Sequence, residues 1–375
     1  MKRKLLFLQT EDWSFWSHRL PLARAAKAAG YEVVVALNVD AHGERLRAEG
    51  FRVVHIDWRR GRINPFGELL TLLAVIRLYA REKPDIVHQV AAKPILYGSL
   101  AARVCRLPAV ANTLTGLGFV FVTKGFMASL LRAGIRAAFR LALRLPRSMT
   151  TFQNADDLDM FITQGLAARE KTTLIRGSGV DIAHFTARPE PAGVPLVVLP
   201  ARMLWTKGVE EFVSAARILR AAGVKARFAL VGAPDALNRA AIPAERLAAW
   251  KAEGVVECWG HRDDMREVYA QAHVVCLPSY HEGLPKALME AAAAGRPLVA
   301  ADVPGCREIV RHDETGLLVP AKEVAGLAVA LRRLIEEAPL RQRLGRRARQ
   351  AAVEEFSQEL VVERTLAVYR GLLGA

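Results

Sequence analysis

Short apolar runs alternate with longer amphipathic stretches along this chain, and the alternation occurs twice. In the first part, amphipathic stretches lie at residues 20–29, 44–49 and 65–81. The apolar runs lie at residues 5–9, 33–37, 53–56, 85–88, 109–113 and 149–153. Such a rhythm predicts parallel strands joined by covering helices. We therefore expect a doubly wound α/β domain.

A break at residues 186–195, with three prolines and no hydrophobic periodicity, predicts a linker. A second series of apolar runs follows it, at residues 196–200, 227–231, 255–259, 273–277, 297–300 and 316–319. The pattern predicts two Rossmann-like domains, residues 1–187 and 188–356, and a final helix at about 357–375 that packs back on the first domain. Ligands of such domains bind at the carboxyl ends of the strands, here in a cleft between the two.

The composition narrows the class of partner. With a net charge of +15 and 24% charged residues, the chain is globular and favours an anionic partner. Four cysteines lie far apart in the sequence, which favours free thiols in a reducing compartment. Residues 1–9 read as a first strand and not as a signal peptide, because Glu11 and Asp12 follow directly. Without a run of about 20 uncharged apolar residues, a cytoplasmic, soluble or peripheral protein is expected.

The segment 279–290 follows an apolar strand and opens a helix. Pro285 suits a first helical turn, where its missing N–H has no cost. Backbone N–H groups of Gly283, Leu284, Lys286 and Ala287 would then face a phosphate or a sugar oxygen.

Glu282 lies just before this helix and Glu290 lies inside it, so both carboxylates can face one ligand and accept hydrogen bonds from sugar hydroxyls. The alternative is that Glu282 interacts with the helix dipole and Glu290 is solvated. The apolar run at 291–295 weakens the second half of that alternative.

Arg202 and Lys207 lie where the first strand of the second domain gives way to a helix. Two cations in such a loop can neutralise a diphosphate leaving group, with a guanidinium fork and a compact ammonium charge. A solvated basic loop remains the alternative.

In combination, these residues resemble the GT-B retaining glycosyltransferases of family 4. The shared pattern is an Arg, a Lys-Gly pair and two glutamates eight positions apart in a Glu-Gly-aliphatic-Pro segment, here Arg202, Lys207-Gly208 and Glu282 to Glu290. Supporting matches lie at 177–181, 260–264, 295–299 and 315–319. The resemblance covers the second domain strongly and the first domain less tightly.

The resemblance implies roles for single residues. Arg202 and Lys207 would stabilise the charge that grows on the departing diphosphate, where electrostatic stabilisation is most effective. Glu282 would contact the donor sugar, Glu290 the nucleotide ribose, and the loop with Arg262 the base. The donor would be a UDP-sugar, and attack would occur at the front face without a protein nucleophile.

The first domain resembles members that extend glycans linked to polyprenyl diphosphate. Its candidate acceptor residues are His18, Arg19, Lys93, Thr115 and Gly116. We expect Ser17 to cap a helix that carries His18 and Arg19 in its first turn. The sequence departs from the family pattern after the strand at 109–113, where many relatives have a histidine.

Asp157-Leu158-Asp159 has the spacing of a carboxylate pair that holds a metal in some other glycosyltransferases. It lies in an acidic stretch that reads as a helix start, where carboxylates interact with the helix dipole. We therefore expect no cofactor and no essential metal.

Residues 124–149 carry six basic residues and no acidic one. Arg132, Arg136, Arg140 and Arg144 recur at every fourth position, with Leu130, Leu131, Ile135, Phe139, Leu143 and Leu145 between them. The pattern predicts an interfacial helix on the inner face of the cytoplasmic membrane, with about 1 kcal/mol of attraction per basic residue to anionic lipid. The alternative is a helix packed on the first domain with a basic outer face.

Three other functions remain open at this point. A nucleic-acid-binding protein would explain the charge, but no nucleic-acid partner is expected because the usual binding modules are absent from the sequence. A nucleotide-sugar epimerase or phosphorylase on the same fold would need no lipid acceptor. A non-catalytic nucleotide-sugar-binding protein would keep the donor site without transfer.

Overall fold

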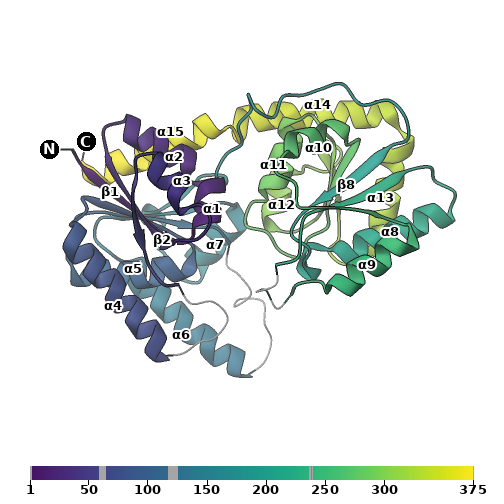
Figure 1. Ribbon diagram of the computed structural model, residues 1–375. Helices are drawn as coiled ribbons and strands as arrows, with labels where there is room; N and C mark the ends of the chain where they lie inside the picture. The colour runs from purple at the N-terminus through teal and green to yellow at the C-terminus, as the bar shows by residue number, and fades with distance from the viewer. Residues whose placement is uncertain (1, 59–64, 117–125, 236–237, 239, 375) are drawn as a thin grey trace. The chain divides into compact units, whose positions relative to one another are not determined.

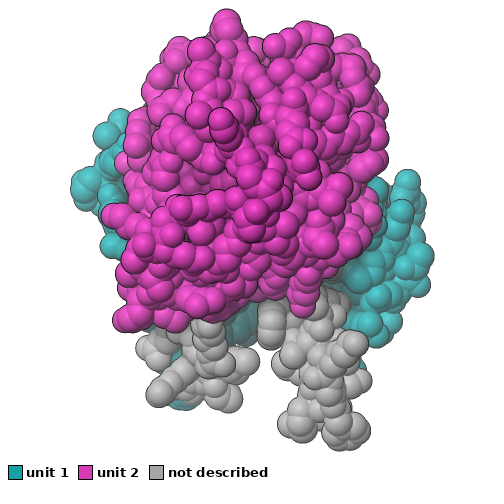
Figure 2. All heavy atoms as spheres, turned by 90° about the vertical axis from the view of Figure 1, so that its right-hand side faces the viewer, with its two compact units in different colours: residues 1–178, 359–375 teal, residues 179–358 magenta. Residues whose placement is uncertain are grey.

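The computed structural model describes residues 2–58, 65–116, 126–235, 238 and 240–374, with the backbone alone at 65 and 126–132. The chain forms two compact units (Figures 1 and 2). Unit 1 comprises Met1–Ser178 and Glu359–Ala375, and unit 2 comprises Gly179–Gln358. Each unit contains one parallel sheet covered by helices.

Unit 1 has a seven-stranded sheet in the order β3-β2-β1-β4-β5-β6-β7. Its strands are β1 (Lys4–Glu11), β2 (Glu32–Asn38), β3 (Arg52–His55), β4 (Ile86–Val90), β5 (Val110–Leu114), β6 (Ser148–Phe152) and β7 (Thr172–Leu174). Neighbouring strands run parallel, for example with Leu5 opposite Val33 and Ile86. β7 is a three-residue edge strand that the sequence pattern did not predict, because its residues are only half buried.

The helices of unit 1 cover both faces of this sheet. They are α1 (Asp12–His18), α2 (Leu20–Ala28), α3 (Gly43–Ala48), α4 (Pro65–Glu82), α5 (Ala92–Val104), α6 (Phe126–Ala142), α7 (Ala155–Thr163) and α15 (Gln358–Leu373). Leu5 and Phe7 of β1 pack with α2, α3 and α15. Leu6 and Leu8 pack on the opposite face, with α4 and α5. The alternation follows from the two-residue period of a strand.

Unit 2 has a six-stranded sheet in the order β10-β9-β8-β11-β12-β13. Its strands are β8 (Leu196–Pro200), β9 (Arg227–Val231), β10 (Glu257–Gly260), β11 (Val274–Leu277), β12 (Leu298–Ala301) and β13 (Gly316–Val319). Its helices are α8 (Val209–Ala221), α9 (Ala244–Glu253), α10 (Met265–Gln271), α11 (Lys286–Ala293), α12 (Pro304–Ile309), α13 (Val324–Glu336) and α14 (Ala338–Glu355). Two apolar cores, one on each face, bury the strands.

The segment expected to be a linker, 186–195, is instead part of unit 2. Arg188 pairs with Glu267 at 3.0 Å, and Glu190 pairs with the buried Arg341 at 2.5 Å. Just upstream, Arg349 donates to the carbonyl of Phe185. The prolines interrupt periodicity, but ion pairs fasten the segment to the domain that follows it. The observed boundary therefore lies at 178/179 and not at 187/188.

Candidate functional site

Two loops at the carboxyl ends of β8 and β11 carry the candidate donor site of unit 2. The two strands are neighbours, with Val197 paired to Val274. The amide of Tyr280 donates to the carbonyl of Thr206 at 2.9 Å, so the loops are joined directly. Gly208 has φ +72°, and a Cβ there would lie 2.1 Å from the carbonyl oxygen of Pro278. Only glycine allows this approach, which brings the Lys207 side chain to the β11 loop.

Lys207 and Glu282 form an ion pair across these loops. Lys207 Nζ donates to Glu282 Oε1 at 2.5 Å, and the side chains are only 19% and 11% exposed. The hydroxyl of the buried Ser279 donates to the same oxygen at 2.7 Å. A charge-assisted pair at this depth is held in one geometry. It presents a cation and a carboxylate at the edge of the sheet, where ligands of doubly wound folds bind.

Glu290 lies inside α11 and is buried, with 8% exposure. The Tyr269 hydroxyl donates to Glu290 Oε2 at 3.1 Å, and Lys286 Nζ lies 3.4 Å from Oε1. Burial raises the pKa of Glu290, while Lys286 and Tyr269 act in the opposite direction. The alternative of a solvated helix residue is therefore wrong. Tyr269 carried no signal in the sequence that linked it to this site.

The helix α11 begins at Lys286, with Pro285 as its N-cap residue. The N–H groups in the first turn of a helix have no acceptor within the helix. The amide of Ala287 lies in the first turn of α11, so it can donate to a ligand. Leu284 contributes its side chain to the core and only its backbone to the loop. Gly283 packs closely against Gly305 of α12. A Cβ on Gly305 would lie 2.4 Å from the Gly283 carbonyl oxygen.

Among the described residues, no hydrogen bond or ion pair joins Arg202 to Lys207, Glu282 or Glu290. Arg202 pairs with Asp235 at 2.7 Å and is 47% exposed. Arg262, in the loop after β10, pairs with Asp264 at 2.5 Å. The structure thus arranges the predicted charges as separate pairs, Lys207 with Glu282, Lys286 with Glu290 and Arg202 with Asp235. Asp235 was not anticipated from the sequence.

The predicted acceptor residues of unit 1 follow three neighbouring strands. His18 and Arg19 follow β1, Lys93 follows β4, and Thr115 with Gly116 follows β5. Lys93 pairs with Glu68 at 2.8 Å. The expected cap at Ser17 is wrong, because Ser17 lies within α1 and Arg19 is the N-cap residue of α2. Carboxyl ends of adjacent parallel strands meet at one edge, so these residues share that edge.

A buried polar group behind this edge was missed by the sequence reasoning. His88 of β4 has Nδ1 2.5 Å from the Tyr369 hydroxyl and Nε2 2.7 Å from Thr113 Oγ1. Burial, and then the charge of Arg19, holds the pKa of His88 well below its usual value. Burial also lowers the pKa of Arg19 to about 10, and its Nε has no hydrogen-bond partner among the described residues.

Ala91 joins β4 to α5 in an unusual backbone conformation, φ +77° and ψ 163°. That region is essentially restricted to glycine. Its amide donates to the carbonyl of Thr113 at 3.0 Å, which holds the turn in place beside Lys93. Strain of this kind persists only where the surroundings over-determine it, and it clusters at ligand sites.

Two family models match the chain. The model described as Glycosyl transferases group 1 matches residues 194–337, and the model described as Glycosyl transferase 4-like matches residues 4–145. The chain belongs to the group 1 glycosyltransferases. Lys207, Glu282 and Glu290 all lie within the stretch that the first of these models matches.

Several curated glycosyltransferases are similar over nearly the full length. The chain is 28% identical to N,N'-diacetylbacillosaminyl-diphospho-undecaprenol alpha-1,3-N-acetylgalactosaminyltransferase of Campylobacter jejuni, over 97% of each chain. It is 24% identical to the capsular polysaccharide biosynthesis glycosyltransferase CapM of Staphylococcus aureus, over 95% of each chain.

Solved structures show that this glycosyltransferase has the GT-B fold. HepE of Anabaena, in complex with UDP and glucose, matches with a TM-score of 0.79 and 19% identity, over 98% of this chain and 99% of that one. The sucrose-phosphate synthase of Thermosynechococcus elongatus matches with a TM-score of 0.81 and 20% identity, over all of both chains. The expected α/β class with two doubly wound domains is confirmed.

The Asp157-Leu158-Asp159 carboxylates of this group 1 glycosyltransferase are engaged locally. Asn154 caps α7 by accepting from the Asp157 amide at 2.7 Å, and it also donates to the Asp157 carboxylate at 2.9 Å. Asp159 lies 3.9 Å from Arg169. In the described residues, His, Cys, Asp and Glu side chains form no group of three or more that could hold a metal. That no metal is essential stays a prediction.

The predicted interfacial helix is α6 in part. Lys124 and the side chains of 126–132, including Arg132, lie outside the described residues. Phe139, Leu143 and Leu145 were expected to form a membrane-facing surface. They are instead buried, Phe139 to 1% exposure, and Phe139 and Leu143 pack in one core with Phe152 and Phe161. This half of the helix uses its apolar face for the interior, because the same amphipathic pattern serves either environment. Among the described residues, no helix is long and apolar enough to cross a bilayer.

Proposed function

We propose that this group 1 glycosyltransferase moves a sugar, with retention of configuration, from a UDP-sugar to a hydroxyl of a glycan linked to a polyprenyl diphosphate. The reaction would serve the synthesis of a cell-surface polysaccharide or glycoconjugate. The Lys207–Glu282 pair at the carboxyl edge of the unit 2 sheet carries the proposal. The names of the Campylobacter jejuni and Staphylococcus aureus relatives support the acceptor class and the process. The UDP complex of HepE supports the donor class.

The geometry gives each residue a task. Lys207 would neutralise the diphosphate as it departs, and Arg202 would add a second cation after leaving Asp235, an exchange that an exposed pair makes at little cost. Glu282, held by Ser279 and Lys207, would accept hydrogen bonds from donor-sugar hydroxyls. Glu290 would bind the ribose, and Arg262 with its loop would meet the base. Backbone amides of Gly283, Leu284, Lys286 and Ala287 would complete the contacts.

The proposed step balances without a protein nucleophile or a metal. The acceptor oxygen forms a bond to the anomeric carbon on the face that the diphosphate leaves. The bond between that carbon and the diphosphate oxygen breaks, and the electron pair stays with the diphosphate. The same oxygen takes the proton of the acceptor hydroxyl. The cations stabilise the charge that develops on the leaving group, and such electrostatic stabilisation supplies most of the rate enhancement in many enzymes.

The acceptor proposal rests on unit 1. His18, Arg19, Lys93, Thr115 and Gly116 follow adjacent strands, and Arg19 is a buried cation with an unpartnered Nε. A buried guanidinium without a carboxylate is costly unless an anion reaches it. The diphosphate of a lipid-linked acceptor would supply that anion.

Membrane association at the cytoplasmic face is proposed on a changed basis. Apolar contact would come from α4 and not from α6, because Phe66, Leu69 and Leu70 in the first turns of α4 are exposed, Phe66 to 68%. Arg140 and Arg144 of the adjoining basic stretch are also exposed. The helices α4 and α6 flank α5 on one face of unit 1 (Figure 1). The apolar side chains lie near the start of α5, where Lys93 pairs with Glu68, and the basic ones lie near its end, where Arg103 donates to the Leu141 carbonyl. Apolar contact and attraction to anionic lipid would therefore act at opposite ends of these helices.

The test incubates the protein with membrane extract and a panel of labelled UDP- and GDP-sugars. We expect label from one UDP-sugar to become lipid-extractable, in the presence of EDTA, with the anomeric configuration retained by NMR. Conversion of the donor without any acceptor would instead support the epimerase alternative. If no sugar donor is consumed but duplex or single-stranded nucleic acid binds with steep salt dependence, the glycosyl-transfer proposal is wrong.

A further inference from the structure

Unit 1 contains a second basic site, away from the acceptor edge. A pocket of about 790 Å³ is lined by Lys2 and Arg3 before β1, by Gly30 and Tyr31 before β2, and by Leu366 and Arg370 of α15. It therefore lies at the amino ends of β1 and β2. His18, Arg19 and Thr115 follow the carboxyl ends of their strands, so the pocket is at the opposite edge of the sheet from the proposed acceptor residues.

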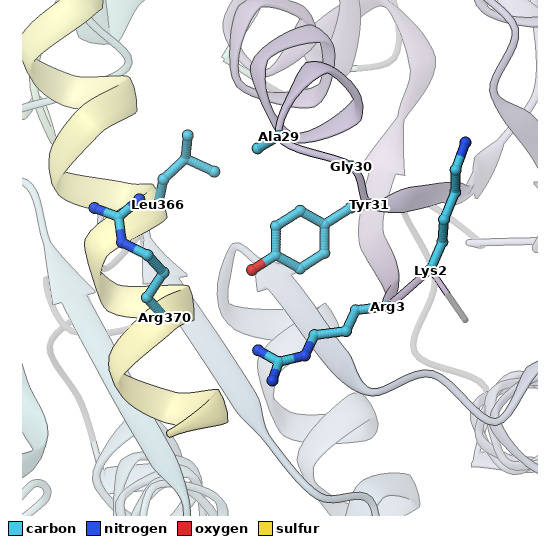
Figure 3. A pocket seen from close by; sticks show the side chains of 7 residues that line it. All are labelled: Lys2, Arg3, Ala29, Gly30, Tyr31, Leu366 and Arg370. Carbon is cyan, nitrogen blue, oxygen red and sulfur yellow. The ribbon is translucent and has the colours of Figure 1, made fainter. Parts of the chain in front are cut away.

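The local fold shapes this pocket. Gly30 ends α2 with φ +92°, and the amide of Tyr31 donates back to the Ala26 carbonyl at 3.1 Å. This left-handed end of the helix is the usual role of glycine. It turns the chain so that Tyr31 projects between β1 and α15. In Figure 3 the Tyr31 hydroxyl points toward the side where the Arg3 and Arg370 guanidinium groups lie, whereas the Lys2 ammonium points away.

The charge of the pocket is not balanced by the protein. No ion pair joins Lys2, Arg3 or Arg370 to a carboxylate of the described residues, and no acidic side chain lines the pocket there. The nearest carboxylate along the chain, Glu32, is engaged by Lys4 at 3.4 Å. Many other arginines of the chain are paired, such as Arg24 with Glu49 and Arg227 with Glu257. Like charges gathered in one concavity raise the local potential and favour an anion.

The donor set indicates the chemical class of that anion. A guanidinium group can bind a phosphate through two parallel hydrogen bonds. Because no carboxylate lines this pocket, the N–H donors of Arg3 and Arg370 remain available for such bonds. The Tyr31 hydroxyl adds one donor, and Leu366 with Ala29 adds an apolar wall for an organic group. We propose that this pocket binds a phosphate or diphosphate ester at a site separate from the donor and acceptor sites. This proposal does not depend on the proposed function.

A contact path leads from the pocket to the interior of unit 1. The Tyr31 ring packs edge-on against Tyr369, with centroids 6.3 Å apart. The Tyr369 hydroxyl contacts His88, and His88 contacts Thr113, two positions before Thr115. An anion held between Arg3 and Arg370 would fasten α15 to the segment before β1, and α15 carries Tyr369. Ligand binding at the pocket would therefore stabilise unit 1.

The experiment measures binding of inorganic pyrophosphate to the full chain by calorimetry at low salt. We expect three sites, because Lys207 also marks the proposed donor diphosphate site and Arg19 marks the proposed acceptor diphosphate site. The variant Arg3→Gln/Arg370→Gln should lose one site, with affinity at least about tenfold weaker, as expected from two lost charge-assisted contacts. Lys207→Ala should lose the donor site and keep the pocket. Arg77→Gln/Arg364→Gln removes the same charge from exposed positions outside the pocket and should keep every site.

The proposal is overturned if Arg3→Gln/Arg370→Gln binds pyrophosphate with the stoichiometry and affinity of the unmodified chain, or if the matched control loses binding equally. A failure of Lys207→Ala to lose a site would contradict the donor assignment alone. Flotation with vesicles of phosphatidylglycerol or of phosphatidylcholine distinguishes the source of the phosphate. A lipid headgroup is the source if the pocket variant loses binding to phosphatidylglycerol, and a soluble ester is the source if flotation is unchanged.

Discussion

Lys207 Nζ lies 2.5 Å from Glu282 Oε1, although 75 positions separate the two residues in the chain. The contact exists because β8 and β11, which precede the two loops, are neighbours in the sheet. The Ser279 hydroxyl, which donates to Glu282, and the backbone hydrogen bond from Tyr280 to Thr206 hold this ion pair in place. A ligand entering this edge of unit 2 would meet a cation and a carboxylate whose positions are already set, which reduces the reorganisation needed during the reaction.

Lys207→Ala and Glu282→Gln should each lower kcat for sugar transfer by about 10²–10³-fold, the usual cost of removing one electrostatic stabiliser. The circular dichroism spectrum should be unchanged. As a control, Arg217→Gln removes one partner of the half-buried ion pair between Arg217 of α8 and Glu253 of α9, and transfer should remain normal. Near-normal turnover by both site variants would refute the assignment of the donor site.

Glu290→Gln should change the pH dependence of stability. The pKa of Glu290 is raised above 4.5 by burial, so its protonated form favours the folded state. That contribution is fully present below pH 4.5 and is lost as the pH rises through the folded-state pKa. Urea unfolding between pH 4 and pH 8 should therefore show the variant gaining stability relative to the unmodified chain as the pH rises.

Glu336→Gln serves as the control for that series, because it removes an exposed carboxylate of α13. Its stability difference from the unmodified chain should vary less with pH. A Glu290→Gln difference that stays constant across the range would show that Glu290 is not held in a desolvated site.

Tyr369→Phe should destabilise the protein by about 1–3 kcal/mol, because His88 Nδ1 would be left buried without its partner. Denaturant unfolding followed by tryptophan fluorescence measures the change. Tyr31→Phe is the matched variant, since its ring contact with Tyr369 is kept, and about 0.5 kcal/mol or less is expected for it. Equal effects of the two variants would mean that the His88 contact contributes little.

Ala91→Gly should stabilise the protein by about 1 kcal/mol. Relief of an unfavourable backbone region is worth about 1–3 kcal/mol, and the added freedom of glycine in the unfolded chain offsets about 0.5–1 kcal/mol of it. Ala80→Gly, at an exposed position inside α4, should instead cost about 1 kcal/mol. Thermal unfolding of both variants decides the matter, and loss of stability in Ala91→Gly would contradict the strain at this turn.

Arg140→Gln/Arg144→Gln should weaken binding to phosphatidylglycerol vesicles, by about 1 kcal/mol per removed charge at most. Phe66→Ser/Leu69→Ser should weaken binding to anionic vesicles through lost apolar contact. Turnover on a soluble acceptor analogue should change less in both. Arg332→Gln/Arg333→Gln removes equal charge from unit 2 as a control. Unchanged vesicle binding in the first two variants would end the interfacial proposal.

Much of the fold was readable from local pattern. The run before Ser279, the glycine and proline at 283–285 and the helical stretch after them predicted a strand, a loop and a helix, because each depends on nearby residues. Ion pairs between residues that are distant in the chain were harder to predict from the sequence. The linker prediction at 186–195 was wrong because its ion pairs, Arg188 with Glu267 and Glu190 with Arg341, join distant positions.

The sequence by itself determined the two α/β domains and the residue types at their strand ends, since periodicity records which face of each element is apolar. Only the tertiary structure decided what covers each face and which charges meet. Phe139 faces a core and not a lipid surface, Arg202 meets Asp235, and Tyr369 reaches His88 from 281 positions away. Strand order and packing set these contacts, and neither is contained in a pattern that repeats every two or every 3.6 residues.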